Sequence, residues 1–160
     1  GLGPLLMKMG VVAAHPANLH RLLFDEGELV LAFPEGAAGG QKPLRERYRL
    51  RDFAQAGFMA AAAGAGVPIV PVAVMGSEEA VPVIARLGPR LPLVPPIPLP
   101  AKFDIRFLAP VHTAHPRRLA GIAQTPAQLA ERAREAIQDC LLEMLERRSS
   151  AWFSSRGGHR

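Results

Sequence analysis

The sequence E-L-V-L-A-F-P-E-G, residues 28–36, decides the fold that we expect for this chain. Residues 29–33 are all apolar, a pattern that predicts a strand covered on both faces, as in the parallel sheets of α/β proteins. Pro34 has no N–H to donate to a ladder, so the strand should end there. Glu35 and Gly36 would then lie at the carboxyl end of a parallel strand, where open α/β sheets bind ligands. We therefore predict that the Glu35 side chain has a functional role at a ligand-binding site.

Helices and a second strand are predicted around this first strand. Pro16 suits the first turn of a helix that ends near Phe24, and the alanine-rich residues 53–65 predict another helix. Residues 67–75 have the pattern of a second buried strand. Strand, connection, helix and strand in this order predict a right-handed crossover between two parallel strands. The expected fold is a single α/β domain, with a mostly parallel central sheet flanked by helices.

A proline-rich segment and an alternating strand follow. Six prolines among apolar residues at 87–100 exclude a helix and a central strand. This segment is expected to be an apolar loop over the core, or a lip that touches an acyl chain or a membrane surface. Residues 102–107 alternate as a half-buried strand, with Phe103, Ile105 and Phe107 on its apolar side.

A long amphipathic helix is expected next. T-P-A-Q at 125–128 has the form of a capping box with proline at the first helical position, and an apolar stripe continues to about Arg147. Cys140 belongs to that stripe, which predicts packing and not a nucleophile. Residues 149–160 are expected to form a flexible tail, which leaves residues 1–148 as the predicted domain.

One uncharged stretch allows two interpretations. Residues 56–76 contain no Asp, Glu, Lys or Arg and are long enough to span a bilayer. Two glycines and two prolines interrupt the stretch where a membrane helix would continue, and its second half is rich in β-branched residues. We therefore expect a helix and a strand of the core.

Composition limits the class of protein. A length of 160 residues fits one domain, and a hydrophobic fraction of 49% excludes a disordered chain. The net charge of +5 favours anionic partners, namely phosphorylated metabolites, acidic lipid surfaces or nucleic acid. A single cysteine excludes an internal disulfide and favours the cytoplasm. The chain opens at Gly1 without a methionine or a visible signal peptide, so we expect a fragment of a longer protein.

Two short blocks and the segment between them resemble a known family. F-P-E-G at 33–36 and V-P-I-V-P-V at 67–72 are similar to the third and fourth blocks of the lysophospholipid acyltransferase superfamily of glycerolipid synthesis. K-P-L-R-E-R-Y-R-L-R-D-F at 42–53, with Gly-Phe at 57–58, resembles the connecting segment of the branch grouped with monoacylglycerol and diacylglycerol acyltransferases. The resemblance covers about residues 11–107. It implies that the domain is the C-terminal part of a larger glycerolipid acyltransferase domain.

The activity that the resemblance implies is transfer of a fatty acyl group to a hydroxyl of a lysophospholipid or related glycerolipid. The donor would be acyl-CoA or an acyl-carrier protein, and no other cofactor is expected. The protein would touch an anionic membrane surface peripherally. The alternative function is a non-catalytic basic module that binds anionic lipid surfaces or, less favoured, nucleic acid. Because only 6% of the residues are aromatic and no recognition motif is present, we expect no nucleic-acid partner.

The resemblance also implies catalytic residues that this sequence lacks. In the family, a histidine and an aspartate five positions later, upstream of F-P-E-G, act as general base and orienting carboxylate. Only 32 residues precede Phe33, and no such block lies at the proper distance. The family's usual Thr-Arg after F-P-E-G is replaced by Ala-Ala at 37–38. His20 and Asp25 have the spacing, but a helix would point them about 140° apart, so we expect surface residues. No catalytic residue and no metal site is assigned.

The basic segment is the predicted substrate contact. Arg45, Arg47, Arg49 and Arg51 recur at every second position, so an extended segment would carry them on one face. With Lys42 they are expected to bind the phosphate of a lysophospholipid or of coenzyme A, because guanidinium groups bind phosphate bidentately. A solvated loop and general attraction to an anionic membrane are the alternatives. The predicted substrate-binding residues are Phe33, Pro34, Glu35, Gly36, Lys42, Arg45, Arg47 and Arg49.

Overall fold

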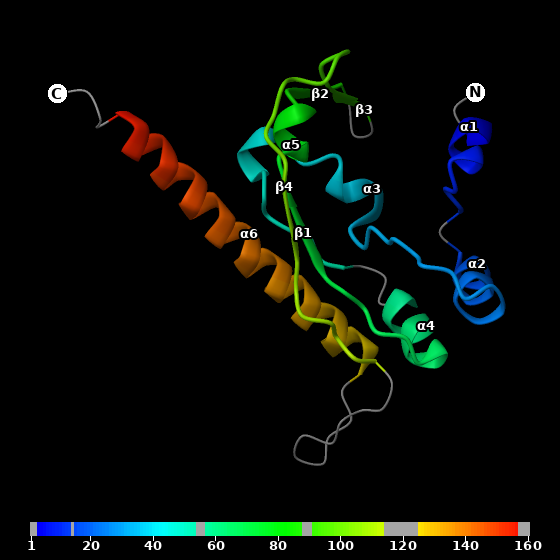
Figure 1. Ribbon diagram of the computed structural model, residues 1–160. Helices are drawn as coiled ribbons and strands as arrows, with labels where there is room; N and C mark the ends of the chain where they lie inside the picture. The colour runs from blue at the N-terminus through cyan, green and yellow to red at the C-terminus, as the bar shows by residue number, and fades with distance from the viewer. Residues whose placement is uncertain (1–2, 14, 54–56, 88–90, 114–124, 157–160) are drawn as a thin grey trace.

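The computed structural model of the chain describes residues 3–13, 15–53, 57–87, 91–113 and 125–156. The α-helices are α1 (Gly3–Lys8), α2 (Pro16–His20), α3 (Gly36–Gly39), α4 (Gly57–Ala65), α5 (Ser77–Ala80) and α6 (Pro126–Arg156). The strands are β1 (Val72–Met75), β2 (Ala85–Leu87), β3 (Leu91–Leu93) and β4 (Asp104–Phe107). A π-helical turn, η1 (Arg21–Asp25), continues α2, and a 3-10 turn, η2 (Leu44–Glu46), follows α3. In Figure 1, α6 runs along β1 and β4 on one side of the molecule, and α1 and α2 lie on the other.

Two small antiparallel sheets are present where the sequence predicted one parallel sheet. β1 pairs with β4, with Val72 opposite Phe107, and β2 pairs with β3 as a hairpin. Among the described residues, the one parallel contact is an isolated bridge between Pro43 and Val83. Helices and strands are mixed in one domain, as expected, but the mostly parallel central sheet is not observed. The reason is that β1 finds its hydrogen-bonding partner in a later strand and not in residues 29–33.

Residues 29–33, the predicted central strand, are extended, unpaired and exposed. The exposed fraction is 100% for Leu29, 74% for Leu31 and 77% for Phe33. A strand is stabilised by ladder partners and covered faces, and the described part of the chain supplies neither here. The prediction of a buried strand is therefore wrong. The extended segment ends at Pro34, where the chain turns and enters α3.

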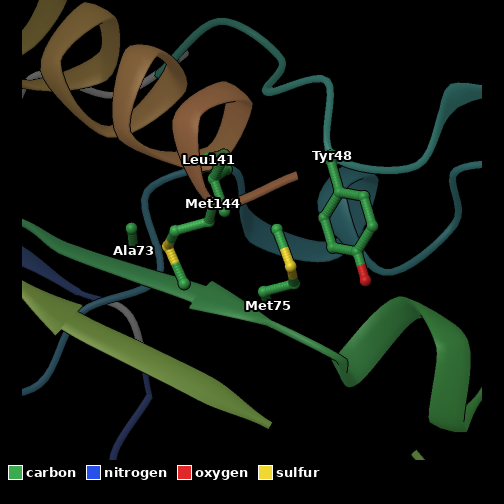
Figure 2. Close-up of a cluster of buried hydrophobic side chains, with 5 residues drawn as sticks. All are labelled: Tyr48, Ala73, Met75, Leu141 and Met144. Carbon is green, nitrogen blue, oxygen red and sulfur yellow. The ribbon is translucent and has the colours of Figure 1, made fainter. Parts of the chain in front are cut away.

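The main core lies between α6 and β1. Its buried members are Tyr48, Ala73, Met75, Leu141 and Met144 (Figure 2). Ala73 and Met75 alternate along β1 and point to the same face of the sheet, as a half-buried strand requires. A smaller cluster joins α4 to α6 through Met59, Ala130 and Ala133. The long helix α6 is therefore the element on which both clusters are built.

The start of α6 confirms the predicted capping box. The backbone N–H of Gln128 donates to Oγ1 of Thr125 at 3.2 Å, and the backbone N–H of Thr125 donates to Oε1 of Gln128 at 2.9 Å. Proline occupies the first helical position. The helix continues to Arg156, beyond the predicted end near Arg147. The division of the chain at residue 148 stays a prediction.

The apolar side of β4 faces away from the core. Phe103, Ile105 and Phe107 share one side, as the alternation predicted, but their exposed fractions are 52%, 56% and 75%. Arg106, on the opposite side, places a guanidinium nitrogen 3.3 Å from a carboxylate oxygen of Glu143 in α6. The expectation that the apolar side would be buried is wrong, because the other face of the β1–β4 sheet packs on α6.

Two predictions based on glycines and prolines are confirmed in the described residues. The proline-rich segment contains no helix or central strand, and the uncharged stretch contains a helix and a strand. β2 and β3 form a hairpin that enters the proline-rich segment, and residues 94–103 are irregular up to β4. This segment contains neither a helix nor a central strand in its described part. The described part of residues 56–76 contains α4 and β1. Within the described ranges, no helix is long and apolar enough to cross a membrane.

Candidate functional site

Residues 42–51, which we call the arginine loop, follow α3 and lie beside α5 and the hairpin at one end of the molecule (Figure 1). The loop is not extended, because it contains η2 and because Tyr48 has a positive φ of 61°. That backbone conformation is unfavourable for a bulky side chain and persists only where surrounding contacts hold it. The alternation of the arginines therefore does not by itself place them on one face.

Lys42 anchors the beginning of the loop from inside the protein. Only 4% of its side chain is exposed, and its ammonium nitrogen lies 2.7 Å from Glu78 Oε1 and 3.4 Å from Glu35 Oε1. The same nitrogen donates to the backbone carbonyl of Arg49 at 3.0 Å. A buried charge is tolerated when it is paired and hydrogen-bonded in this way. The ammonium group therefore faces two carboxylates of the protein itself.

Glu35 joins both ends of the arginine loop. Its Oε1 accepts a hydrogen bond from the backbone N–H of Arg51 at 2.6 Å, in addition to the ion pair with Lys42. Its side chain is 17% exposed. Glu35 stands at the N-cap position of α3 but makes no capping hydrogen bond. The carboxylate that the sequence singled out thus satisfies a backbone donor and a buried cation.

Tyr48 and Gln138 hold the middle of the loop. Glu78 Oε2 accepts from the backbone N–H of Tyr48 at 2.5 Å, and the phenol oxygen of Tyr48 accepts from the backbone N–H of Gly76 at 3.1 Å. Gln138 of α6 donates to the carbonyl of Tyr48 at 2.8 Å and accepts from the N–H of Leu50 at 2.7 Å. The middle of the loop is therefore fixed by α5, with its N-cap residue Gly76, and by α6.

Burial and a neighbouring carboxylate keep Tyr48 protonated. Burial is the larger cause, and together with the hydrogen bond to Glu79 it raises the pKa of the Tyr48 phenol from 10 to about 12. The hydrogen bond from Gly76 and the charge of Arg148 oppose this rise. Arg148 also pairs with Glu79, with a nitrogen–oxygen distance of 2.9 Å. Tyr48 is consequently neutral at physiological pH and has a structural role.

Three of the four arginines meet in one open groove of about 630 Å³. The groove is lined by Leu44, Arg45, Arg47, Tyr48, Arg49, Leu142 and Leu145. Arg51 lies elsewhere: with Arg45 it lines a second groove of about 310 Å³ beside the hairpin, and its guanidinium lies 3.3 Å from Glu46. The side chain of Arg45 is 84% exposed. The first groove is thus lined by arginines of the loop and by leucines, two of which belong to α6.

The other predicted residues lie outside this groove. Phe33 is exposed on the extended segment, and Gly36 starts α3 with a φ of +57°. The His20 ring stacks on Phe24 with a centroid distance of 4.2 Å, and both His20 and Asp25 are exposed. Within the described ranges, no group of three His, Cys, Asp or Glu residues could hold a metal ion.

Sequence reasoning missed the residues that build the loop. Glu78 and Glu79 follow a strand pattern directly, and an acidic pair at a strand end was a usable signal. Tyr48 is the one tyrosine of the chain, but none of its sequence neighbours predicted a positive φ at this position. Gln138 lies 90 residues from Tyr48 in sequence, so no local pattern could have paired them.

Comparison with known proteins finds similarity to one family model and to several mycobacterial proteins. Residues 2–75, just under half of the chain, match the family model described as Acyltransferase. Uncharacterized proteins of Mycobacterium bovis and Mycobacterium tuberculosis are each 36% identical to the chain over 170 residues, covering 95% of it and 47% of their own length. An uncharacterized protein of Mycobacterium leprae is 35% identical and is covered to 46%. The chain spans about half the length of these curated relatives. No solved structure matches it significantly.

Proposed function

We propose that this chain binds a phosphorylated glycerolipid acceptor, such as a lysophospholipid, for acyl transfer from acyl-CoA or an acyl-carrier protein. The observation that carries the proposal is the groove in which Arg45, Arg47 and Arg49 meet Leu142 and Leu145. Guanidinium groups match a phosphate, and leucines match the carbons next to it. The family match supports the acyl-transfer class, and the acceptor is our proposal.

Preorganisation of the loop supports this role. The arginines are carried on a backbone that Glu78, Gln138 and Glu35 hold by hydrogen bonds at Tyr48, Leu50 and Arg51, respectively. A fixed backbone lowers the entropy that is lost when exposed side chains close on an anion. We accordingly propose the three groove arginines as the phosphate contacts, and Glu35 and Lys42 as the residues that hold the loop in place.

The proposed reaction makes an ester from a thioester. The acceptor hydroxyl oxygen attacks the thioester carbonyl, the C–O bond forms, the C–S bond breaks, and the hydroxyl proton passes through a base to the leaving thiolate. His20 stacks on Phe24, and His15 caps α2 by accepting from the backbone N–H of Ala17. Within the described ranges, no histidine is paired with a carboxylate, and we propose that this part of the chain supplies acceptor binding without the general base.

The proposed setting is the cytoplasmic surface of an anionic membrane. The net charge of +5 and the exposed arginines favour this setting, because each basic residue near an anionic surface contributes about 1 kcal/mol. The thioester donor is the one cosubstrate in the proposal. The alternative function is a non-catalytic basic module on such surfaces, which would bind anionic lipid without preferring an acceptor that carries a free hydroxyl.

Binding of a short-chain lysophosphatidate, below its micelle concentration, tests the proposal by calorimetry. Replacing Arg47 and Arg49 together by Gln should weaken binding at least about tenfold, since hydrogen bonds to charged groups contribute about 1.5–3 kcal/mol each. The variant should also reduce the salt dependence of binding. A matched control, Lys8→Gln with Arg21→Gln, removes the same charge from α1 and η1 on the other side of the molecule and should bind normally. Equal losses for a neutral monoacylglycerol would contradict a phosphate site.

A further inference from the structure

The hairpin and the stretch after it expose apolar side chains beside the arginine loop. We call Ile84, Leu93, Val94 and Ile97 the hairpin patch, and their exposed fractions are 67%, 46%, 38% and 74%. The backbone N–H of Ile84 donates to the carbonyl of Leu93 at 3.0 Å, which continues the ladder of β2 and β3. The hairpin of β2 and β3 lies at one end of the molecule (Figure 1), and the residues of the patch belong to it or directly adjoin it in sequence, up to Ile97.

Backbone contacts join the hairpin patch to the arginine loop. The isolated bridge between Pro43 and Val83 ties the beginning of the loop to the residue before Ile84. Arg45 and Ile84 both line the second groove, and Arg45 also lines the first. Ile84 of the hairpin patch and the exposed Arg45 thus lie on one surface, although they are distant in sequence.

We propose that this surface docks on an anionic lipid bilayer. The hairpin patch enters the boundary between headgroups and acyl chains, and Arg45, Arg47 and Arg49 lie at the level of the phosphates. The charge complementarity of arginine and lipid phosphate identifies the occupant. Arg45 is paired with Glu46 at 3.8 Å, but a neutral apolar partner would offer no counter-charge to the exposed Arg47 and Arg49. The inference rests on the proposed function in one respect, that these arginines bind lipid phosphate.

The backbone of the patch suits this environment. Four prolines lie between residues 95 and 100, and a proline has no N–H that must keep a hydrogen bond when water is removed. The backbone N–H of Leu99 is already satisfied by the carbonyl of Ala80 at 2.7 Å. Most donors of this stretch are therefore absent or paired before any contact with lipid, which lowers the cost of leaving water.

A second exposed apolar row provides a matched control. Ile105 and Phe107 of β4 are 56% and 75% exposed, as apolar as the patch, but they lie on the outer face of the β1–β4 sheet. Neither residue lines a groove with the arginines. If exposed apolar area alone drove membrane binding, this row would contribute as much as the hairpin patch.

Vesicle co-sedimentation of the 160-residue chain tests the proposal. The chain should bind vesicles of phosphatidylcholine with phosphatidylglycerol, and bind pure phosphatidylcholine at least about tenfold more weakly, since each arginine at an anionic surface changes partitioning about fivefold. Ile84→Asn with Ile97→Asn should lower binding to the anionic vesicles about tenfold or more, through lost apolar burial. Ile105→Asn with Phe107→Asn should leave it unchanged. Circular dichroism should show equal melting for both pairs, because all four side chains are exposed.

Three outcomes would overturn the docking surface: equal binding to both vesicle types, equal losses for the two asparagine pairs, or no vesicle binding at all. The calorimetric titration with soluble lysophosphatidate separates this failure from failure of the proposed function. Normal binding of that soluble ligand together with absent vesicle binding would refute only the docking surface. Loss of both lysophosphatidate binding and vesicle binding would refute the phosphate site on which the docking surface rests.

Discussion

At the scale of single residues, the Glu35 carboxylate has a structural role in holding the arginine loop. The side chain stands where a parallel strand would end, which suggested contact with a ligand. In the structure, the same carboxylate accepts from the N–H of Arg51 and pairs with the buried ammonium of Lys42. Removing its charge therefore acts on the arginine loop first.

Glu35→Gln should destabilise the chain by about 1–3 kcal/mol, because the buried Lys42 loses one of its two carboxylates and the hydrogen bond from Arg51 becomes a neutral one. Urea unfolding followed by circular dichroism measures the free energy of unfolding. Glu28→Gln is the matched control, since Glu28 is exposed on the neighbouring extended segment. Unchanged stability in Glu35→Gln, with weakened lysophosphatidate binding, would instead favour the direct ligand contact.

The Tyr48 phenol makes stability depend on alkaline pH. Its pKa in the folded protein is raised to about 12, whereas the unfolded value is near 10. Between these values the unfolded chain releases the proton while the folded chain keeps it, so stability is fully present below pH 10 and falls as the pH rises toward 12. The expected loss over this window is on the order of 2 kcal/mol.

Tyr48 is the one tyrosine, so phenolate absorbance reports this residue alone. The titration midpoint should lie near 12 in the folded protein and near 10 in urea. Tyr48→Phe should cost about 1 kcal/mol at neutral pH, because the N–H of Gly76 loses its acceptor, and should reduce the fall in stability above pH 10. A folded-state midpoint near 10 would contradict the buried, carboxylate-bonded phenol.

At the scale of elements, α6 organises the molecule. Its residues Leu141 and Met144 pack on β1, and Ala130 and Ala133 pack on α4. Gln138 on the same helix holds the arginine loop by two backbone hydrogen bonds. One helix therefore supplies the core, the support of the loop and the leucines of the groove. By contrast, residues 29–33 have strand-like composition but no partner in the described chain, so they remain a single extended segment.

At the scale of the whole molecule, the similarity to the Acyltransferase family model stands beside contacts of His15 and His20 that do not suit a general base. The acyltransferase match covers residues 2–75, and the chain spans about half the length of its curated relatives. General-base catalysis commonly contributes about 10² to 10⁴ in rate, so acceptor binding without a positioned base should give little turnover. Acceptor binding and acyl transfer can therefore be measured separately on this chain.

We expect no acyl transfer by the 160-residue chain under conditions in which it binds lysophosphatidate. A thioester-consumption assay with acyl-CoA and a lysophospholipid measures this directly. His20→Ala is the informative variant, because His20 and Asp25 have the family's spacing although His20 stacks on Phe24. Activity that disappears in His20→Ala would contradict the proposal and make His20 the base.

The sequence by itself determined the features that depend on near neighbours. The capping box at Thr125, the turn at Pro34 and the family blocks at 33–36 and 67–72 could be predicted because each signal lies within a few residues. Tertiary structure alone decided which strand pairs with β1, which face of β4 meets water and how the arginine loop is held. The contacts of Tyr48 with Gly76 and Gln138 join residues 28 and 90 positions apart, and over such separations a composition pattern carries no information about the partner.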